Sequence, residues 1–125
     1  MGTQFRPELA WKIYRDEKWQ TRRLFKEGDT YETDMFGNIT VVRRNGRVKY
    51  RVGRMESIQP GRGVKGICKR RIERLRLELV GEISEPDSIA EGFACRGEFL
   101  ATFKKINRKS TTDNLTWVVD FERPQ

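Results

Sequence analysis

The chain is organised around Lys18-Trp19-Gln20-Thr21-Arg22-Arg23, a six-residue run that carries an amine, a hydroxyl and two guanidinium groups. On a strand, successive side chains face opposite ways, so Thr21 and Arg23 share one face and Arg22 lies on the other. Lys18 lies at the corner between a helix and this strand, where its long side chain can fold back toward Thr21. Because Lys, Thr and Arg are ordinary surface residues, a solvated basic strand also accounts for the run.

A helix is expected before this run and a strand within it. Pro7 suits a first helical position, Glu8 suits the positive end of the helix dipole, and apolar residues recur at helical spacing, which predicts a helix from Pro7 to Asp16. A strand is expected from Thr21 to Lys26, followed by a turn at Gly28-Asp29.

Asn45-Gly46 is the strongest hairpin signal in the chain, because both residue types tolerate the positive φ of a type I′ turn. A two-residue loop would pair Arg44 with Arg47, Val42 with Lys49, Val41 with Tyr50 and Ile39 with Val52. One face of the hairpin would then be apolar. The other face would carry four cations, here called the basic ribbon: Arg44, Arg47, Lys49 and Arg51. The basic ribbon is either a solvated face or a surface that contacts phosphates.

The second half of the chain predicts a loop, a long bent strand, two helices and a last strand. The loop covers Gln59 to Gly63 and includes Arg62, in a glycine-rich setting that permits close approach to a ligand. Alternation changes phase within Gly66 to Val80, which predicts a bulge near Glu73 and favours a closed barrel over a flat sheet. The remaining expected elements are a short helix that Ser84 caps and Gly92 ends, a helix from Arg96 to Asn107, and a strand from Leu115 to Glu122.

Composition fits a single domain over residues 1–125 with a polyanionic partner. Lys and Arg number 26 against 18 acidic residues, which gives a net charge of +8. Such an excess favours RNA or another single-stranded nucleic acid, although many small basic proteins bind no nucleic acid specifically. With no signal peptide and no apolar run long enough for a membrane span, we expect a soluble cytoplasmic protein that contacts no membrane.

The residue types present restrict the chemistry. The chain has no histidine, which excludes His-based triads, and its two cysteines, Cys68 and Cys95, have no C-x-x-C spacing. We therefore expect neither a metal nor a cofactor, and two reduced, half-buried thiols. Any catalysis must use Lys, Thr, Tyr, Arg, a carboxylate or a thiol.

The order of these motifs resembles that of ASCH domains. The signature Gly-x-Lys-x-x-Thr-x-Arg of that family is matched at Lys18, Thr21 and Arg23. The later matches are Ala90-Glu91-Gly92-Phe93, Glu98-Phe99 and the Trp117 to Glu122 strand. The resemblance covers nearly the whole chain and is greatest to the ASCH proteins of phages and prophages. It implies an α+β fold of the PUA-like superfamily, a small mixed β-barrel with flanking helices.

The resemblance also implies two kinds of function. ASCH domains have a cleft proposed to bind RNA or nucleotides, and some members are described as nucleases. Small bacterial members include an amidohydrolase that deacetylates acetylcytidine with a lysine, a threonine and a glutamate. Those catalytic roles would fall on Lys18, Thr21 and, with a one-residue alignment gap, Glu91. A binding cleft would use Trp19, Arg22, Arg23, Arg62 and the basic ribbon.

Two residues depart from the family signature. Asp16 replaces its glycine, and a carboxylate there would hold the Lys18 amine protonated and make it a poorer base. Trp19 follows the lysine, where threonine is common, and offers a face on which a base can stack. Both departures favour an RNA- or nucleotide-binding domain over the alternative, an amidohydrolase acting on an acylated nucleoside. The geometry of Lys18, Thr21 and Glu91 discriminates between them, since catalysis requires all three within hydrogen-bond reach.

Overall fold

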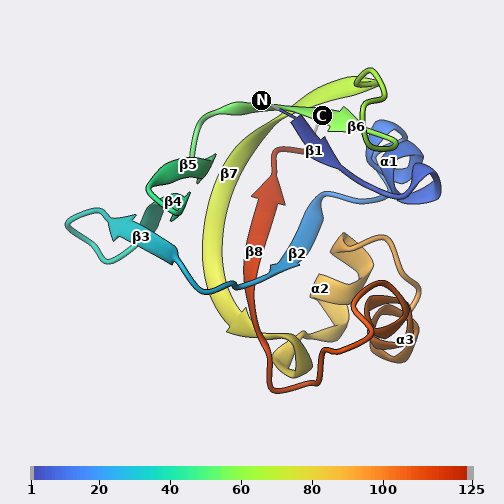
Figure 1. Ribbon diagram of the computed structural model, residues 1–125. Coiled ribbons are helices and arrows are strands. Elements are labelled where there is room, and N and C mark those ends of the chain that lie inside the picture. Colours follow the sequence, from blue (N-terminus) through green and yellow to red (C-terminus); the bar gives the residue numbers. More distant parts are fainter. Residues whose placement is uncertain (1, 124–125) are drawn as a thin grey trace.

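The structure, a computed structural model, describes residues 2–123 as a mixed sheet with three α-helices (Figure 1). The strands are β1 (Gly2–Gln4), β2 (Gln20–Leu24), β3 (Asp29–Thr33), β4 (Ile39–Arg44), β5 (Arg47–Arg51), β6 (Met55–Gln59), β7 (Cys68–Leu79) and β8 (Leu115–Phe121). The helices are α1 (Pro7–Tyr14), α2 (Glu85–Ala90) and α3 (Arg96–Ile106), with a 3-10 turn at Val80–Glu82.

The long strand β7 is the centre of the sheet. It pairs antiparallel with β6, β4 and β8, and β8 continues the sheet to β2. Strand β1 runs parallel to β6, which makes the sheet mixed. The predicted bulge is confirmed, because the β7 to β8 register shifts between Ile72 and Arg74. The resulting curve of β7 wraps the sheet around one side of the molecule (Figure 1).

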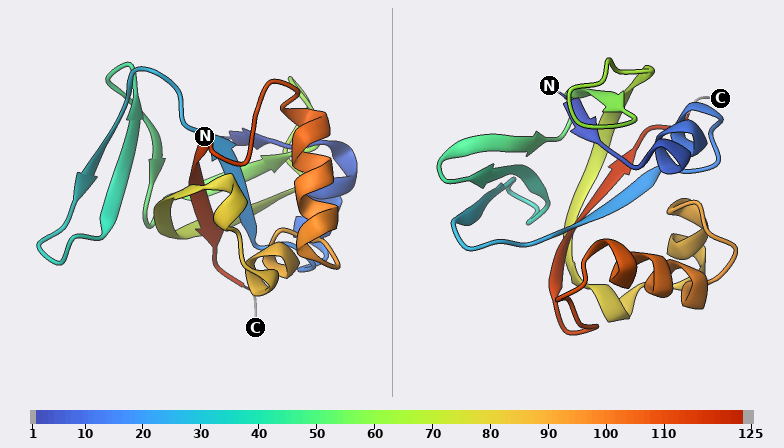
Figure 2. Two further views of the ribbon diagram at one scale, coloured as in Figure 1. Left: turned by 90° about the horizontal axis from the view of Figure 1, so that it is seen from below. Right: turned by 45° about the vertical axis from the view of Figure 1, so that its right-hand side comes forward.

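The α+β class, the mixed sheet and the flanking helices are confirmed, but the sheet does not close into a complete barrel. Among the strands that the structure describes, β1, β2, β3 and β5 each pair with a single neighbour. The free side of β2 lies next to α2 and α3, whereas β3, β4 and β5 form an arm that projects from the opposite side (Figure 2). Strand β2 is therefore an edge strand of an open sheet.

The Asn45-Gly46 turn is confirmed, but the predicted hairpin register holds only at its end. Asn45 and Gly46 have φ values of 53° and 81°, and Arg44 lies opposite Arg47. A register shift between Val42 and Arg43 then places Val42 opposite Tyr50 and Val41 opposite Arg51. This bulge lets both consecutive valines become buried, which regular alternation forbids. The predicted pairing of Val42 with Lys49 is therefore wrong.

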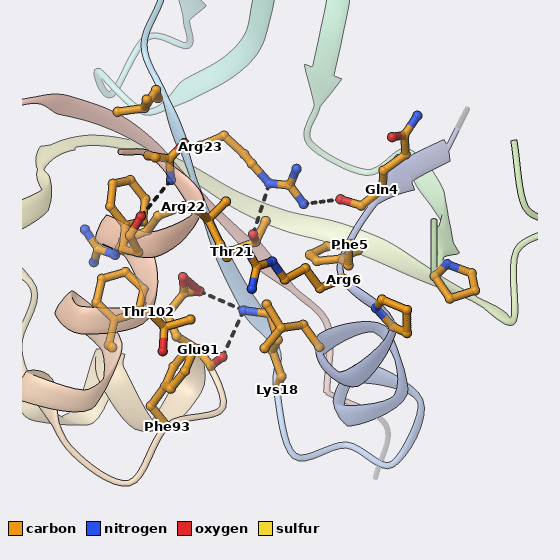
Figure 3. Close-up of a pocket in the computed structure, with 18 of the residues that line it drawn as sticks. Gln4, Phe5, Arg6, Lys18, Thr21, Arg22, Arg23, Glu91, Phe93 and Thr102 are labelled. Atoms are coloured by element: carbon orange, nitrogen blue, oxygen red, sulfur yellow. Dashed lines mark hydrogen bonds and ion pairs between the residues drawn. The ribbon is translucent and has the colours of Figure 1, made fainter. Parts of the chain in front are cut away.

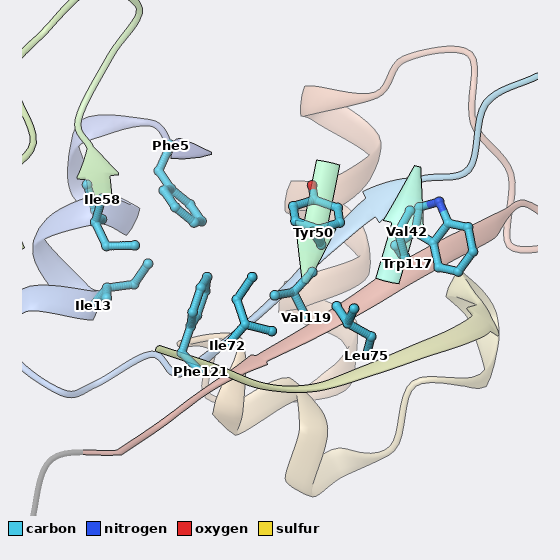
Figure 4. Close-up of a cluster of buried hydrophobic side chains, with 11 residues drawn as sticks. Phe5, Ile13, Val42, Tyr50, Ile58, Ile72, Leu75, Trp117, Val119 and Phe121 are labelled. Atoms are coloured by element: carbon cyan, nitrogen blue, oxygen red, sulfur yellow. The ribbon is translucent and has the colours of Figure 1, made fainter. Parts of the chain in front are cut away.

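A main hydrophobic core fills the concave side of the sheet (Figure 4). A smaller core includes two phenylalanines of α3. The main core joins Ile13 of α1 to Trp117, Val119 and Phe121 of β8, and Trp117 is fully buried. Burial of a large aromatic side chain is among the strongest stabilising contributions available to a domain of this size. The smaller core contains Val80, Ile83, Phe99 and Phe103. Leu24 of β2 packs against this smaller core.

Local signals at the helix ends are largely confirmed. Ser84 caps α2 by accepting a hydrogen bond from the Asp87 amide at 3.1 Å, as the capping spacing predicts. Both cysteines are free, but Cys95 is exposed rather than half-buried. No helix within residues 2–123 has the length and apolar character required to cross a membrane.

Candidate functional site

A cavity of about 460 Å³ lies between β2, α1, α3 and the segment that follows α2. Its wall includes all three candidate catalytic residues, Lys18, Thr21 and Glu91, together with Arg23 (Figure 3). Arg62, from the Gln59 to Gly63 loop, lines the same space, so that predicted loop does approach the site. We call this space the central cavity.

Lys18 has its ammonium group buried between β2 and the end of α2. Its Nζ donates to the carbonyl oxygens of Gln20 at 2.7 Å and Glu91 at 2.9 Å, and to the Glu91 carboxylate at 3.2 Å. An ammonium group has three N–H donors, so these bonds use all of them. Burial lowers the pKa of Lys18, and the Glu91 carboxylate opposes that shift.

Glu91 lies at the C-terminal cap of α2, where the helix dipole disfavours a carboxylate. The side chain is buried against Lys18, and burial raises its pKa while Lys18 opposes the shift. Gly92 makes this arrangement possible with a φ of +95°, since a Cβ there would lie 3.2 Å from the Lys18 Cβ. The close approach brings the Glu91 backbone carbonyl within reach of the amine.

Thr21 is buried and faces the central cavity on the same side of β2 as Arg23, as predicted. Its Oγ1 accepts a hydrogen bond from Arg23 Nε at 3.2 Å. Arg23 also donates from Nη2 to the Gln4 carbonyl at 2.6 Å. Its Cζ atom lies 4.6 Å from the Phe5 ring centroid. The threonine hydroxyl is therefore oriented by an arginine, whereas the amine of Lys18 is oriented by Glu91.

A second cavity of about 450 Å³ adjoins the central one. Gln4 and Arg23 line both spaces and thus form the wall between them. The second cavity is rich in cations and includes three members of the basic ribbon, Arg44, Arg47 and Lys49. We call this space the basic cavity.

The guanidinium groups of two candidate binding arginines form ion pairs within the protein. Arg22 is fully buried and pairs with Glu78 at 3.1 Å and Asp87 at 3.2 Å. Arg44 forms a two-point ion pair with Asp29, at 2.7 Å and 3.0 Å. Both side chains connect strands of the fold, so neither has its charge available for a ligand.

Two other candidates lie away from both cavities. The Arg123 guanidinium covers the Trp19 ring, and its Cζ atom lies 3.8 Å from the ring centroid. Arg51 is exposed at the end of β5, and it lines neither the central nor the basic cavity. Besides the paired Arg22 and Arg44, the candidate binding cations that line a cavity are Arg23, Arg47, Lys49 and Arg62.

The expected influence of Asp16 on Lys18 is wrong. Asp16 is exposed and pairs with Arg70 at 3.1 Å, and the carboxylate beside Lys18 is that of Glu91. Asp16 has a φ of 63°, a conformation that glycine adopts without strain. The family glycine that Asp16 replaces is thus explained by backbone conformation at the corner between α1 and β2.

Several residues of the central cavity are not predicted from the sequence. Gln4 and Phe5 reach it because β1 pairs with β6, a contact between distant segments that no local pattern indicates. Phe93 and Ile106 form part of its apolar wall, and 43% of Ile106 is exposed. Phe99 and Phe103 of α3 belong to the smaller core and also line the central cavity.

No family model matches the chain, and no curated protein matches it. Two crystal structures are similar over 93% of the chain. One is an ASCH domain from Lactobacillus crispatus JV V101, with a TM-score of 0.61, 19% identity and 70% of that chain covered. The fold is that of an ASCH domain.

The second is protein EF3133 from Enterococcus faecalis V583, described by the family model DUF984. It has a TM-score of 0.60 and 18% identity, with 69% of that chain covered. The ASCH fold expected from the ordered motifs is confirmed. At this level of identity, the likeness establishes the ASCH fold, and the activity must be argued from the cavities.

Proposed function

We propose that this ASCH-fold domain binds RNA or a nucleotide, with a base in the central cavity. The observation that carries the proposal is the cavity itself, which combines an apolar aromatic wall with buried polar groups and an arginine at its edge. Its volume of about 460 Å³ lies in the range of small-ligand sites. Single-stranded RNA is recognised by this combination of stacking and hydrogen bonding to base edges.

Each part of the cavity has a role in this proposal. Phe93 supplies an apolar face for the base, and Thr21 and Thr102 supply hydroxyl groups for its polar edge. Arg23 is already held by Gln4 and Thr21, so little conformational entropy is lost when it meets a ligand. The net charge of +8 then supports a polyanionic partner.

The test is fluorescence anisotropy with labelled single-stranded RNA at several salt concentrations. Thr102→Phe adds a ring inside the cavity, and we expect it to abolish binding, whereas Ala101→Phe adds the same ring on the exposed side of α3 and preserves it. The parent's affinity should fall steeply with salt. Absence of binding by the parent at low salt, or unchanged binding by Thr102→Phe, would contradict the proposal.

The position of Lys18, Thr21 and Glu91 in one cavity also favours a second candidate, an amidohydrolase for an acylated nucleoside. In this reaction, a neutral Lys18 amine removes the Thr21 proton and the hydroxyl oxygen attacks the acyl carbonyl carbon. The C–N bond breaks as Glu91 delivers a proton to the leaving amine. Water then attacks the acyl-threonine ester, releases the carboxylic acid and restores the hydroxyl.

Acetate release from acetylcytidine tests this candidate in the parent, Lys18→Ala, Thr21→Ala and Glu91→Ala. General acid and base assistance supplies about 100-fold to 10,000-fold in rate, so each variant should lose most turnover. Glu91→Ala and Lys18→Ala also require a folding check, since each leaves a buried partner unpaired. Equal acetate release by all four proteins, or no release by the parent, would contradict the amidohydrolase function. Nucleotide binding would then be the one proposed function that remains.

A further inference from the structure

The basic cavity contains far more positive than negative charge. Five cations line it: Arg23, Arg44, Arg47, Lys49 and Arg54. Glu56 is the one carboxylate among the lining residues that the structure describes there. This composition leaves an excess of positive charge around a space of about 450 Å³. That charge must be balanced either by carboxylates elsewhere in the fold or by a ligand.

Two of the five cations are balanced by the fold. Arg44 pairs with Asp29, and Arg54 pairs with Glu56 at 2.7 Å. Glu56 also accepts a hydrogen bond from the Thr3 hydroxyl at 3.0 Å, so both of its oxygens are used. These contacts fix the cavity wall without adding net charge to the space.

The other three, Arg23, Arg47 and Lys49, have no carboxylate within ion-pair distance anywhere in residues 2–123. Lys49 is half-buried, and its pKa is lowered by burial and then by the neighbouring charges of Arg44 and Arg23. Bringing cations together costs free energy that an anion in the same space would recover. The three side chains thus form an unbalanced cluster around a cavity of ligand size.

Arg23 connects this cluster to the central cavity. It lines both spaces, and its guanidinium is held by Gln4 and Thr21, as Figure 3 shows. A guanidinium has five N–H donors, and these two bonds leave others for a ligand. A molecule that extends from the central to the basic cavity must pass Arg23.

We propose that the basic cavity is a phosphate subsite of the central cavity, formed by Arg23, Arg47 and Lys49. The ligand is therefore phosphorylated, a nucleotide or an RNA strand rather than a free nucleoside. This inference rests on the proposed function for what occupies the central cavity. Charge-assisted hydrogen bonds from three cations suit the several oxygens of a phosphate, and they hold a strand in position without reading its sequence.

The experiment is isothermal titration calorimetry with three sets of probes: the four ribonucleosides, their 5′-monophosphates and inorganic pyrophosphate. The variant is Arg47→Ala combined with Lys49→Ala. Its control is Arg74→Ala combined with Lys69→Ala, two exposed cations on β7 that line neither cavity. Circular dichroism melting shows that each protein is folded, and single Lys49→Gln replaces the double variant if that protein is not.

We expect a monophosphate to bind at least about tenfold tighter than its nucleoside in the parent, the effect of a charge-assisted contact. The Arg47 and Lys49 variant should lose this advantage while its nucleoside affinity stays unchanged, and the control should match the parent. Equal affinity of nucleoside and monophosphate, or a retained advantage in the variant, overturns the subsite.

Pyrophosphate separates failure of the subsite from failure of the proposed function. If no nucleoside, monophosphate or RNA binds, the proposed function fails, and pyrophosphate alone decides the subsite. Weaker pyrophosphate binding in the Arg47 and Lys49 variant than in the control supports an anion site that accepts free phosphates. No pyrophosphate binding, or equal binding by the two variants, overturns it.

Discussion

Asp29→Asn should reduce the stability of the protein in a way that depends on pH. Asp29 is a buried carboxylate at the start of β3 that receives four hydrogen bonds. Arg44 donates two of them, the Trp117 indole donates one at 2.8 Å, and the Lys26 amide donates one at 2.9 Å. The carboxylate thus connects the β3 to β5 arm to the central tryptophan of β8.

The size of the effect follows from the pKa of Asp29. Burial alone would raise this pKa, but the hydrogen bonds from Arg44, Lys26 and Trp117 outweigh it and lower the pKa from 3.8 to about 2. A difference of this size corresponds to about 2 to 3 kcal/mol of folding free energy. Because the folded pKa is the lower one, the contribution is present above pH 3.8 and is lost as the pH falls toward 2.

Urea unfolding at pH 7 and at steps down to pH 2 measures the effect. Asparagine keeps the shape of Asp29, and its oxygen can still accept the Trp117 hydrogen bond. Like the protonated acid, it is neutral and has a donor in place of one acceptor, so it imitates Asp29 at low pH. We expect the variant to be less stable by about 2 to 3 kcal/mol at pH 7, and the difference to narrow below pH 4. Asp113→Asn, in an exposed loop, is the control and should stay within about 0.5 kcal/mol of the parent. A difference at pH 7 no larger than the control's, or one that persists at pH 2, would refute the reasoning.

Three further changes test the buried charges and the corner before β2. Burial lowers the pKa of Lys18 below its unfolded value, so the parent should gain stability over Lys18→Met as the pH rises from 7 to 10.5, measured by urea unfolding. Arg22→Met removes a buried cation that pairs with Glu78 and Asp87, both of which keep Arg76 as a partner, and should cost about 1 to 3 kcal/mol in the same assay, more than Arg74→Met on the surface. Asp16→Gly should change the thermal unfolding free energy by less than about 1 kcal/mol, because relief of the positive φ offsets the loss of an exposed ion pair. A larger loss in Asp16→Gly would show that the ion pair matters more than the backbone.

The sequence predicted those structural features that depend on a few neighbouring residues. The Asn45-Gly46 turn, the Ser84 cap and the bulge in β7 are each specified by neighbouring residues. Strands β1, β3 and β6 were not predicted. Strand β1 has three residues, most of β3 is exposed, and β6 buries a charged residue, Glu56. The hairpin register failed at Val42 because the gain from burying a second valine is a tertiary effect, which alternation along one strand does not contain.

The residues of the candidate site were likewise predicted only in part. Resemblance placed Lys18, Thr21 and Glu91, and all three line one cavity. The sequence did not distinguish ligand-binding cations from structural ones, because the acids that neutralise Arg22 and Arg44 come from other segments. Asp87 is 65 residues from Arg22, and Asp29 is 15 residues from Arg44. Charge counted along a strand therefore overestimates the charge available to a partner.

The hydrogen bonds of Lys18 favour a binding function over a catalytic one. As an ammonium, Lys18 donates all three of its protons to Gln20 and Glu91, and it has no lone pair with which to accept the Thr21 proton. Burial lowers the pKa of Lys18 and raises that of Glu91, so both shifts reduce the free-energy cost of transferring one proton from the amine to the carboxylate. The neutral amine then has a lone pair, but that lone pair accepts the proton now held by Glu91. Catalysis therefore requires Lys18 to turn from Glu91 to Thr21 when the substrate enters, whereas binding uses the cavity as it stands.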